Sequence, residues 1–303
     1  MNGDDLRDWC ERWLGAAPVA AIFTSHKISD VAGVVLADGR QVVVKVRETS
    51  ARIEGCMQVQ GLLHAAGFPC AEPLVGPTPF NSQVATAERY IAGGTPLPRG
   101  PTNASRFGAE LARAVGLLPP PADVPSLEPA PYWMVWDHKL SGVWPPDPDV
   151  DLNSRVGPDW VDDAGARARR RLARASSTHS AIGHSDWESQ NLRWTGDVLL
   201  VAHDWDSAIA RPEAAIAGMA SLMFTSTGFD NEPATIDESA AFINAYEKVR
   251  GRSFSEEERE VAWAAGLWIG TWKAKKATYY GDSGVVVSDL EPQVVERLRR
   301  AGA

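Results

Sequence analysis

Three oxygen-bearing side chains stand in a fixed order in the second half of the chain, and together they could bind a divalent metal ion. Asp186 and Asn191 lie in the polar segment 183–194, and Asp204 follows the apolar run 198–202. Carboxylate and amide oxygens are hard ligands of the kind that Mg²⁺ takes, and Mg²⁺ often accompanies phosphate groups. For any one of these residues, the simpler interpretation is a solvated turn that the side chain caps. The presence of all three in this order favours a site that binds Mg²⁺ together with phosphate.

The elements that must position these residues begin, at the N-terminal end of the chain, with a layer of helices and strands. Apolar residues at spacings of three and four predict an amphipathic helix over residues 5–14. Two β-type runs, 33–36 and 41–46, flank Asp38-Gly39, a pair typical of a hairpin turn. The pattern then predicts a helix over 51–66 and a strand over 83–91. This order predicts a helix packed on an antiparallel sheet.

The remainder of the chain is expected to be mainly helical, with helical patterns over 103–116, 164–175 and from 236 onward. Between them, residues 119–163 have weak periodicity, which predicts a functional cover or a partly disordered segment. Tryptophans in that segment are interpreted as an aromatic wall for a ligand or as plain packing: Trp133, Trp136, Trp144 and Trp160. Three later ones, at near-helical spacing, are predicted to face the core: Trp263, Trp268 and Trp272.

The pattern His184-x-Asp186-x4-Asn191, followed by an apolar strand that ends in Asp204, resembles the catalytic and metal-binding loops of protein-kinase-like enzymes. Asp-Trp-Asp at 204–206 in place of Asp-Phe-Gly, in a chain of 303 residues, resembles the aminoglycoside phosphotransferase family. Residues 38–46 resemble that family's third-strand lysine segment, and residues 62–73 resemble the end of its next helix. The resemblance extends from about residue 21 to about residue 224.

This resemblance implies an α+β fold of the two-lobed protein-kinase type, with a small antiparallel-sheet N-terminal lobe and a mainly helical C-terminal lobe. Residues 1–92 would form the nucleotide-binding lobe. Residues 93–303 would form the catalytic and acceptor-binding lobe.

The resemblance also implies roles for the residues that match the family's motifs. Asp186 would accept the proton of an acceptor hydroxyl, and Asn191 and Asp204 would hold Mg²⁺. Lys45 would bind the α- and β-phosphates of ATP or GTP, and Glu54 would hold Lys45 in place.

Further nucleotide contacts are implied at the two ends of the binding site. Ser25 and Ser29 would cover the phosphates. The backbone of a hinge at Glu88, Arg89 and Tyr90 would meet the base. His184 would orient the catalytic loop, and Asp206 would be either a metal ligand or a supporting partner. The loop departs from the family pattern at Ser185, where glycine is usual, and at residues 187–190.

Composition limits the partners. With 39 acidic against 30 basic residues the chain carries a net charge of -9, so nucleic acid and anionic membranes are not expected to bind, and a cationic small molecule is favoured. Three cysteines without zinc-site spacing indicate a reducing compartment. The acidic N-terminal residues, and the absence of any apolar run of about 18 residues, predict a cytoplasmic protein.

The predicted activity is transfer of the γ-phosphate of MgATP or GTP to a hydroxyl of a small molecule, with Asp186 as the base. The favoured acceptor is an aminoglycoside or a similar cationic antibiotic, which would make the chain an antibiotic-resistance enzyme. A metabolic kinase for choline, homoserine, a sugar or a fructosamine is an alternative, and a non-catalytic nucleotide-binding regulator is another. The sequence leaves the choice of nucleotide, the acceptor-site residues, the oligomeric state and any protein partners open.

Overall fold

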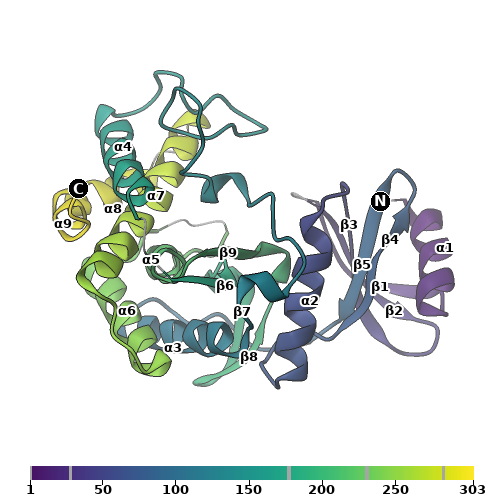
Figure 1. Cartoon of the computed structure of the whole chain (residues 1–303). Helices are drawn as coiled ribbons and strands as arrows, with labels where there is room; N and C mark the ends of the chain where they lie inside the picture. Colours follow the sequence, from purple (N-terminus) through teal and green to yellow (C-terminus); the bar gives the residue numbers. More distant parts are fainter. Residues whose placement is uncertain (1, 27–28, 176–178, 229–231, 282–283) are drawn as a thin grey trace.

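The structure is a computed structural model that describes residues 2–26, 29–175, 179–228, 232–281 and 284–303. Its elements form a small N-terminal lobe around an antiparallel sheet and a larger, mainly helical C-terminal lobe (Figure 1). This arrangement confirms the predicted two-lobed α+β fold. The described elements of the first lobe are α1 (Gly3–Leu14), β1 (Pro18–His26), β2 (Asp30–Leu36), β3 (Gln41–Arg47), α2 (Arg52–Ala65), β4 (Pro73–Phe80) and β5 (Gln83–Arg89).

The five strands lie in the order β1-β2-β3-β5-β4, and every neighbouring pair is antiparallel. The predicted hairpin joins β2 to β3, and Gly39 in its turn has a φ of 85°, a backbone conformation that favours glycine. Strand β3 is central and hydrogen-bonded on both sides, so Lys45 lies opposite Val31 on one side and Thr86 on the other. The sheet therefore holds the lysine at a fixed place.

Residues of the N-terminal lobe belong to two separate hydrophobic cores. Helix α1 packs against the sheet, and the Trp9 indole Nε1 donates a hydrogen bond to the Thr78 hydroxyl at 3.0 Å. Helix α2 belongs to the other core, because Cys56 and Leu63 pack with residues of the C-terminal lobe. Figure 1 shows α2 between the sheet and that lobe. Helix α2 therefore connects the two lobes.

The pattern of residue types does not predict two strands of the sheet, β1 and β4, although the family resemblance of residues 62–73 also implies the entrance of a strand, which is where β4 begins. Strand β4 contains Pro73, Pro77 and Pro79, and proline argues against a central strand because it has no backbone N–H to donate. Both strands lie at the edges of the sheet, where one side of the backbone needs no partner. The prolines of β4 are compatible with that position.

The chain enters the second lobe between β5, which ends at Arg89, and α3, which begins at Pro101. The predicted boundary after residue 92 falls in this connection. The helices and strands described in this lobe are α3 (Pro101–Leu117), α4 (Asp159–Ala173), β6 (Ser180–His184), β7 (Leu192–Thr195), β8 (Val198–Ala202), β9 (Ala208–Pro212), α5 (Glu213–Met223), α6 (Ile236–Arg250), α7 (Glu256–Tyr279), α8 (Gly284–Leu290) and α9 (Val294–Arg300). Strand β6 pairs with β9, and β7 pairs with β8. Across the described ranges, no helix combines the length and the apolar character that crossing a membrane requires.

Helices α5 and α7 approach each other closely at Gly218. A Cβ atom built on Gly218 would lie 1.9 Å from the carbonyl oxygen of Ala262, so only glycine fits there without a shift of backbone. Helix α5 is buried along its whole length. The tightly packed α5–α7 pair therefore supports the loops that connect the short strands.

The segment 119–163 is a cover rather than a disordered stretch. It contains two short 3-10 turns, η1 (Pro121–Asp123) and η2 (Tyr132–Met134), and α4 starts at Asp159, ahead of the predicted helix start at residue 164. Trp144 is buried, its indole Nε1 donates to Asp162 at 2.7 Å, and its ring lies 5.2 Å from that of Trp268. Aromatic packing on α7 thus holds this irregular segment in place.

Candidate active site

The predicted catalytic loop leaves β6 at His184, a buried residue that links two loops. The backbone N–H of Asp186 donates to the His184 Nδ1 at 3.1 Å, so the ring must donate from Nε2, which lies 3.1 Å from the His203 carbonyl oxygen. Burial lowers the pKa of His184, which favours this neutral form. Its contacts are those of the predicted orienting role.

Asp186 lies at the centre of the loop. Its carboxylate accepts a hydrogen bond from the Asn191 side-chain Nδ2 at 2.8 Å, and the same Nδ2 donates to the Asp186 carbonyl oxygen at 2.9 Å. Burial, and then the nearby charge of Glu188, raise the pKa of Asp186 well above its usual value, whereas Lys273 acts in the opposite direction. The Asn191 amide thus orients the carboxyl group, and the raised pKa makes its carboxylate more basic than that of an exposed aspartate.

The structure brings Asn191 and Asp204 to the same place. The N–H of His203 donates to the Asn191 carbonyl oxygen at 2.8 Å, so Asp204 follows one residue after that contact. Asp204 has a φ of 62°, a left-handed conformation that aspartate tolerates better than most residues. Its side chain is 41% exposed, and the Asn191 Oδ1 is not needed for the two bonds that its Nδ2 makes. Both therefore offer hard oxygens that suit Mg²⁺.

Three carboxylates surround Lys45. Its Nζ lies 3.3 Å from Asp204, 3.4 Å from Asp206 and 3.8 Å from Glu88. Burial alone would lower the pKa of Lys45, but Asp206, Glu88 and Asp204 outweigh it and raise that pKa. The lysine is therefore charged and held at the junction of the two lobes.

The predicted pairing of Lys45 with Glu54 needs correction. The buried face of α2 carries Ile53, Cys56 and Gln60, at spacings of three and four, and this places Glu54 on the exposed side of the helix. Among the described residues, the carboxylates within 4 Å of the Lys45 Nζ are those of the three residues given above. Helix α2 instead supplies Gln60.

The side chain of Glu88 makes a contact with Lys45 that the sequence does not predict, since the resemblance implies a role only for the backbone of this residue. It is buried on β5, and the Gln60 Nε2 donates to its carboxylate at 2.9 Å and to the Ala71 carbonyl oxygen at 2.9 Å. A carboxylate on a strand thus faces the lysine, and an amide on α2 holds it. The signal in the sequence is a glutamate near the end of a predicted strand, directly after Ala85, Thr86 and Ala87.

Asp206 forms an ion pair with Lys45. It pairs with both Lys45 and Arg47, and although burial would raise the pKa of Asp206, these two cations lower it to about 2. Of the two roles left open for Asp206, the contacts are those of a supporting partner.

The hinge residues are only partly placed as predicted. The amide of Arg89 donates to Glu72 and the amide of Tyr90 donates to Gln41, so both are used within the N-terminal lobe. The backbone N–H groups of these two residues are therefore already engaged, and contact between the hinge and a base remains a prediction.

The phosphate-covering segment lies at the β1–β2 turn. Ser25 pairs with Val31 across the two strands, and Ser29 immediately precedes β2. Residues 27–28, between them, lie outside the described residues. The contacts that Ser25 and Ser29 make with phosphate remain a prediction.

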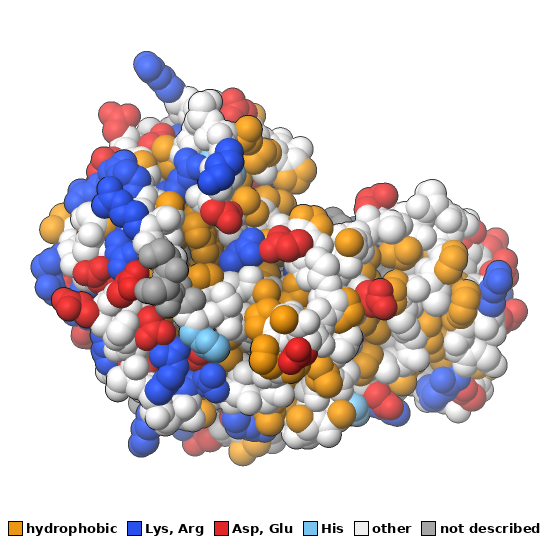
Figure 2. Space-filling model, in the orientation of Figure 1, with side chains coloured by type: hydrophobic (Ala, Val, Ile, Leu, Met, Phe, Trp, Pro, Cys, Tyr) orange, Lys and Arg blue, Asp and Glu red, His pale blue; other side chains and the backbone are white. Residues whose placement is uncertain are grey.

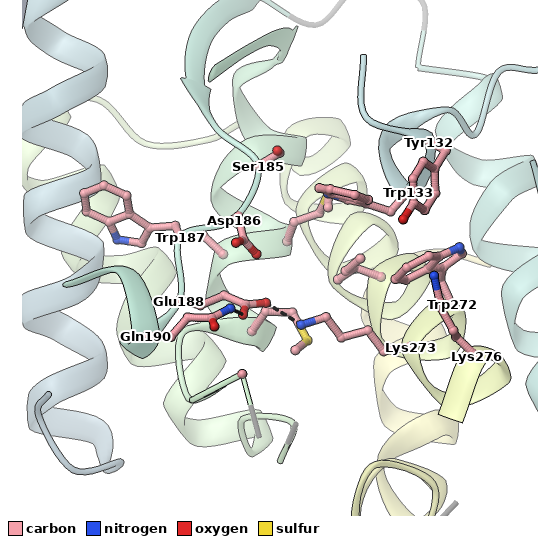
Figure 3. A pocket seen from close by; sticks show the side chains of 15 residues that line it. Tyr132, Trp133, Ser185, Asp186, Trp187, Glu188, Gln190, Trp272, Lys273 and Lys276 are labelled. Carbon is pink, nitrogen blue, oxygen red and sulfur yellow. Dashed lines mark hydrogen bonds and ion pairs between the residues drawn. The ribbon is translucent and has the colours of Figure 1, made fainter. Parts of the chain in front are cut away.

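A cavity of about 240 Å³ opens beside Asp186. The catalytic loop forms one wall, and Tyr132 and Trp133 of η2, together with Trp272 of α7, form the facing wall (Figure 3). The side chain of Trp187 is directed toward α3, where its indole Nε1 donates to the Phe107 carbonyl oxygen at 3.1 Å. The unusual loop sequence therefore anchors the loop on the C-terminal lobe.

A second cavity, of about 400 Å³, is lined by Ser29, Arg47 and Asp204, and it shares Tyr132 and Trp133 with the first. The surface is notched between the lobes on the face shown in Figure 2. The cavity beside Asp204 therefore lies next to the cavity beside Asp186, and the η2 aromatic residues Tyr132 and Trp133 line both.

No family model and no curated protein matches the sequence, whereas several solved structures match the fold. Aminoglycoside phosphotransferase APH(4)-Ia, a thermostable mutant solved with ADP and hygromycin B, is 15% identical, with 98% of this chain and 99% of that chain covered and a TM-score of 0.61. Amicoumacin kinase hAmiN, solved with AMP-PNP, Ca²⁺ and Ami, is 12% identical, with 92% and 88% covered and a TM-score of 0.62.

A further match is an aminoglycoside phosphotransferase from Alicyclobacillus acidocaldarius, 14% identical, with 96% of this chain and 94% of that chain covered and a TM-score of 0.58. At these identities the likeness establishes the fold, and it extends over nearly the whole length of each chain. The chain has the fold of the aminoglycoside phosphotransferases, as its sequence motifs imply.

Proposed function

We propose that this chain is a phosphotransferase that moves the γ-phosphoryl group of ATP or GTP to a hydroxyl of a small molecule. The observation that carries the proposal is the position of Asp186. This carboxylate lines a cavity, is oriented by Asn191, and lies on a loop that His184 ties to the loop of Asp204. A lysine, a base and two metal ligands, which occur along this chain in that order, are the parts that phosphoryl transfer requires.

In the proposed reaction, Asp186 accepts the proton of the acceptor hydroxyl while the oxygen of that hydroxyl forms a bond to the γ-phosphorus. The bond from that phosphorus to the β–γ bridging oxygen breaks, and the nucleoside diphosphate leaves. Lys45 contacts the phosphates, and Asp206 and Glu88 keep its ammonium in place. Mg²⁺ held by Asn191 and Asp204 would supply neutralisation of the phosphate charge.

The solved structures support the choice of co-substrate, since those of hAmiN and APH(4)-Ia contain AMP-PNP or ADP. Their acceptors are a property of those proteins. An aminoglycoside or similar cationic antibiotic is one candidate for this chain, and a metabolic alcohol is another. The non-catalytic alternative is disfavoured, because the base, both metal ligands and the lysine are retained and in mutual reach.

The experiment is a measurement of ADP and GDP release, with Mg²⁺, across a panel of hydroxylated acceptors. Release that depends on an acceptor is expected for the wild-type chain, and Asp186→Asn is expected to slow it by about 10² to 10⁴. Asp163→Asn is a matched control, since its carboxylate is 68% exposed on α4 and pairs with Arg167 in the same helix. Release that is equally fast in Asp186→Asn would contradict the proposed role of the base.

A further inference from the structure

The cavity beside Asp186 has a balanced charge. Among the described residues that line it, two carry an acid, Asp186 and Glu188, and two are lysines, Lys273 and Lys276. Glu188 forms an ion pair with Lys273, drawn as a dashed line in Figure 3, and also accepts a hydrogen bond from the Gln190 side chain at 2.8 Å. One of the two acids is therefore already neutralised, and the other is the proposed base.

Two acidic residues of segment 119–163, Asp147 and Asp149, are also paired with a lysine that lines the cavity. Lys276 lies 2.9 Å from Asp147 and 3.3 Å from Asp149. A molecule that carries several ammonium groups would have to break these pairs, or bury its own charges without partners, and both cost free energy. The described lining is therefore poorly suited to a polycation.

The opposite wall is aromatic and fixed. The rings of Tyr132 and Trp133 lie 4.9 Å apart, and that of Trp272 lies 5.8 Å from the first and 6.1 Å from the second. The Trp268 indole donates to the Trp133 carbonyl oxygen at 2.8 Å, which holds the η2 turn against α7. These rings form a preorganised apolar surface that faces the base.

The protein already places a cation of its own on this wall. The Lys276 Nζ lies 5.4 Å from the centre of the Tyr132 ring and 5.3 Å from that of Trp272, within the range of cation–π contacts. The position that a ligand ammonium would take on these two rings is thus filled. The exposed part of the wall is suited to a flat apolar group.

We infer that the acceptor is a small hydroxylated molecule with a planar apolar or aromatic face and at most one net charge, rather than a polycation. This inference rests on the proposed function, because it assigns the cavity of about 240 Å³ to the acceptor of that reaction. The apolar face packs on the rings of Tyr132, Trp133 and Trp272. That packing directs a hydroxyl to Asp186 on the facing wall.

The test measures binding without nucleotide, by ligand-observed NMR on the full chain. The aromatic probes are a series of aryl alcohols and phenyl glycosides, methyl glucoside is the neutral probe without a ring, and kanamycin is the polycation. Each is titrated into the wild type, into Trp272→Ala, and into the matched control Trp263→Ala. Both tryptophans belong to α7 and are 6% and 8% exposed, but Trp263 packs under Arg297 and Arg300, away from the cavity.

The expected result is that aromatic probes bind more tightly than methyl glucoside and kanamycin. Their Kd should rise about tenfold in Trp272→Ala and stay unchanged in Trp263→Ala. Tighter binding of kanamycin than of every aromatic probe, no binding of any aromatic probe, or equal effects of the two substitutions would overturn the inference.

The outcomes also separate this inference from the proposed function. If kanamycin is phosphorylated at a rate that depends on Asp186, the proposed function holds and the inference about the acceptor falls. If the aromatic probes bind as expected and no nucleoside diphosphate is released with any acceptor, the binding preference of the cavity stands and the proposed function falls.

Discussion

Replacing Glu88 with glutamine tests which carboxylate holds the lysine of the phosphate site. The Glu88 carboxylate lies 3.8 Å from the Lys45 Nζ, against 3.3 Å and 3.4 Å for Asp204 and Asp206. Because Coulomb energy falls as the inverse of distance, Glu88 supplies about a third of the attraction, or about 4 kcal/mol gross at an effective dielectric constant near 20. The fraction of the attraction on Lys45 that comes from Glu88 rises when Asp204 binds a metal ion.

The net effect is smaller than the gross energy, because a charged group also loses hydration when it is buried. The Gln60 Nε2 and the Lys45 Nζ both approach the same oxygen of Glu88, Oε2, so the amide oxygen of the new glutamine can take both contacts, but the negative charge is lost. A loss of about 1.5 to 3 kcal/mol is expected, which lowers kcat/KM for the nucleotide about 10- to 150-fold.

The assay is steady-state release of ADP or GDP with varied nucleotide, after thermal melting has shown that the variant folds. Glu54→Gln is the matched control, since Glu54 is exposed on α2, and it should leave kcat/KM within about twofold of the wild type. A loss in Glu54→Gln as large as that in Glu88→Gln would refute the reasoning.

Three further predictions concern pH and stability. Because the pKa of Asp186 is raised, activity should fall as the pH drops through that pKa. Lys273→Met removes a charge that lowers this pKa, so the acid limb of the pH–rate profile should move to higher pH. A shift of that limb to lower pH would contradict this. Gly218→Ala should lower the free energy of unfolding by about 1 to 3 kcal/mol in urea titrations, whereas Gly76→Ala, where a Cβ meets nothing within 4 Å, should change it by less than about 0.5 kcal/mol. The pKa of Asp206 is lowered from 3.8 to about 2, so its carboxylate stabilises the folded chain above pH 3.8 and loses that effect as the pH falls toward 2. Asp206→Asn should therefore be less stable than the wild type at pH 7, with a gap that narrows over that acid range, and a gap that stays constant would argue against the pairing.

Local sequence patterns predict most of the fold because its elements are strongly periodic or marked by turns. The hairpin at Asp38-Gly39 and the helix that ends before Gly15 are examples, and both are confirmed. Strand β4 is missed because its prolines disguise an edge strand. Asp186 and Asn191 can be predicted together because only five positions separate them, and the structure joins them by two hydrogen bonds.

The rest of the site depends on contacts between distant segments, which a single sequence does not reveal. The choice between Glu54 and Glu88 as partner of Lys45 turns on which face of α2 is buried. Trp133 and Trp272 form one wall from two segments far apart in the chain. Helical periodicity predicts a core position for Trp272, and periodicity alone does not distinguish a residue that faces the core from one that lines a buried cavity.

The most direct test of the central claim is the rate of phosphate transfer from radiolabelled ATP or GTP to an acceptor, in the wild type and in Asp186→Asn, with nucleotide binding measured in parallel. The account predicts an acceptor-dependent product in the wild type, a rate lower by about 10² to 10⁴ in the variant, and unchanged nucleotide affinity. Transfer at the wild-type rate in Asp186→Asn would contradict the account.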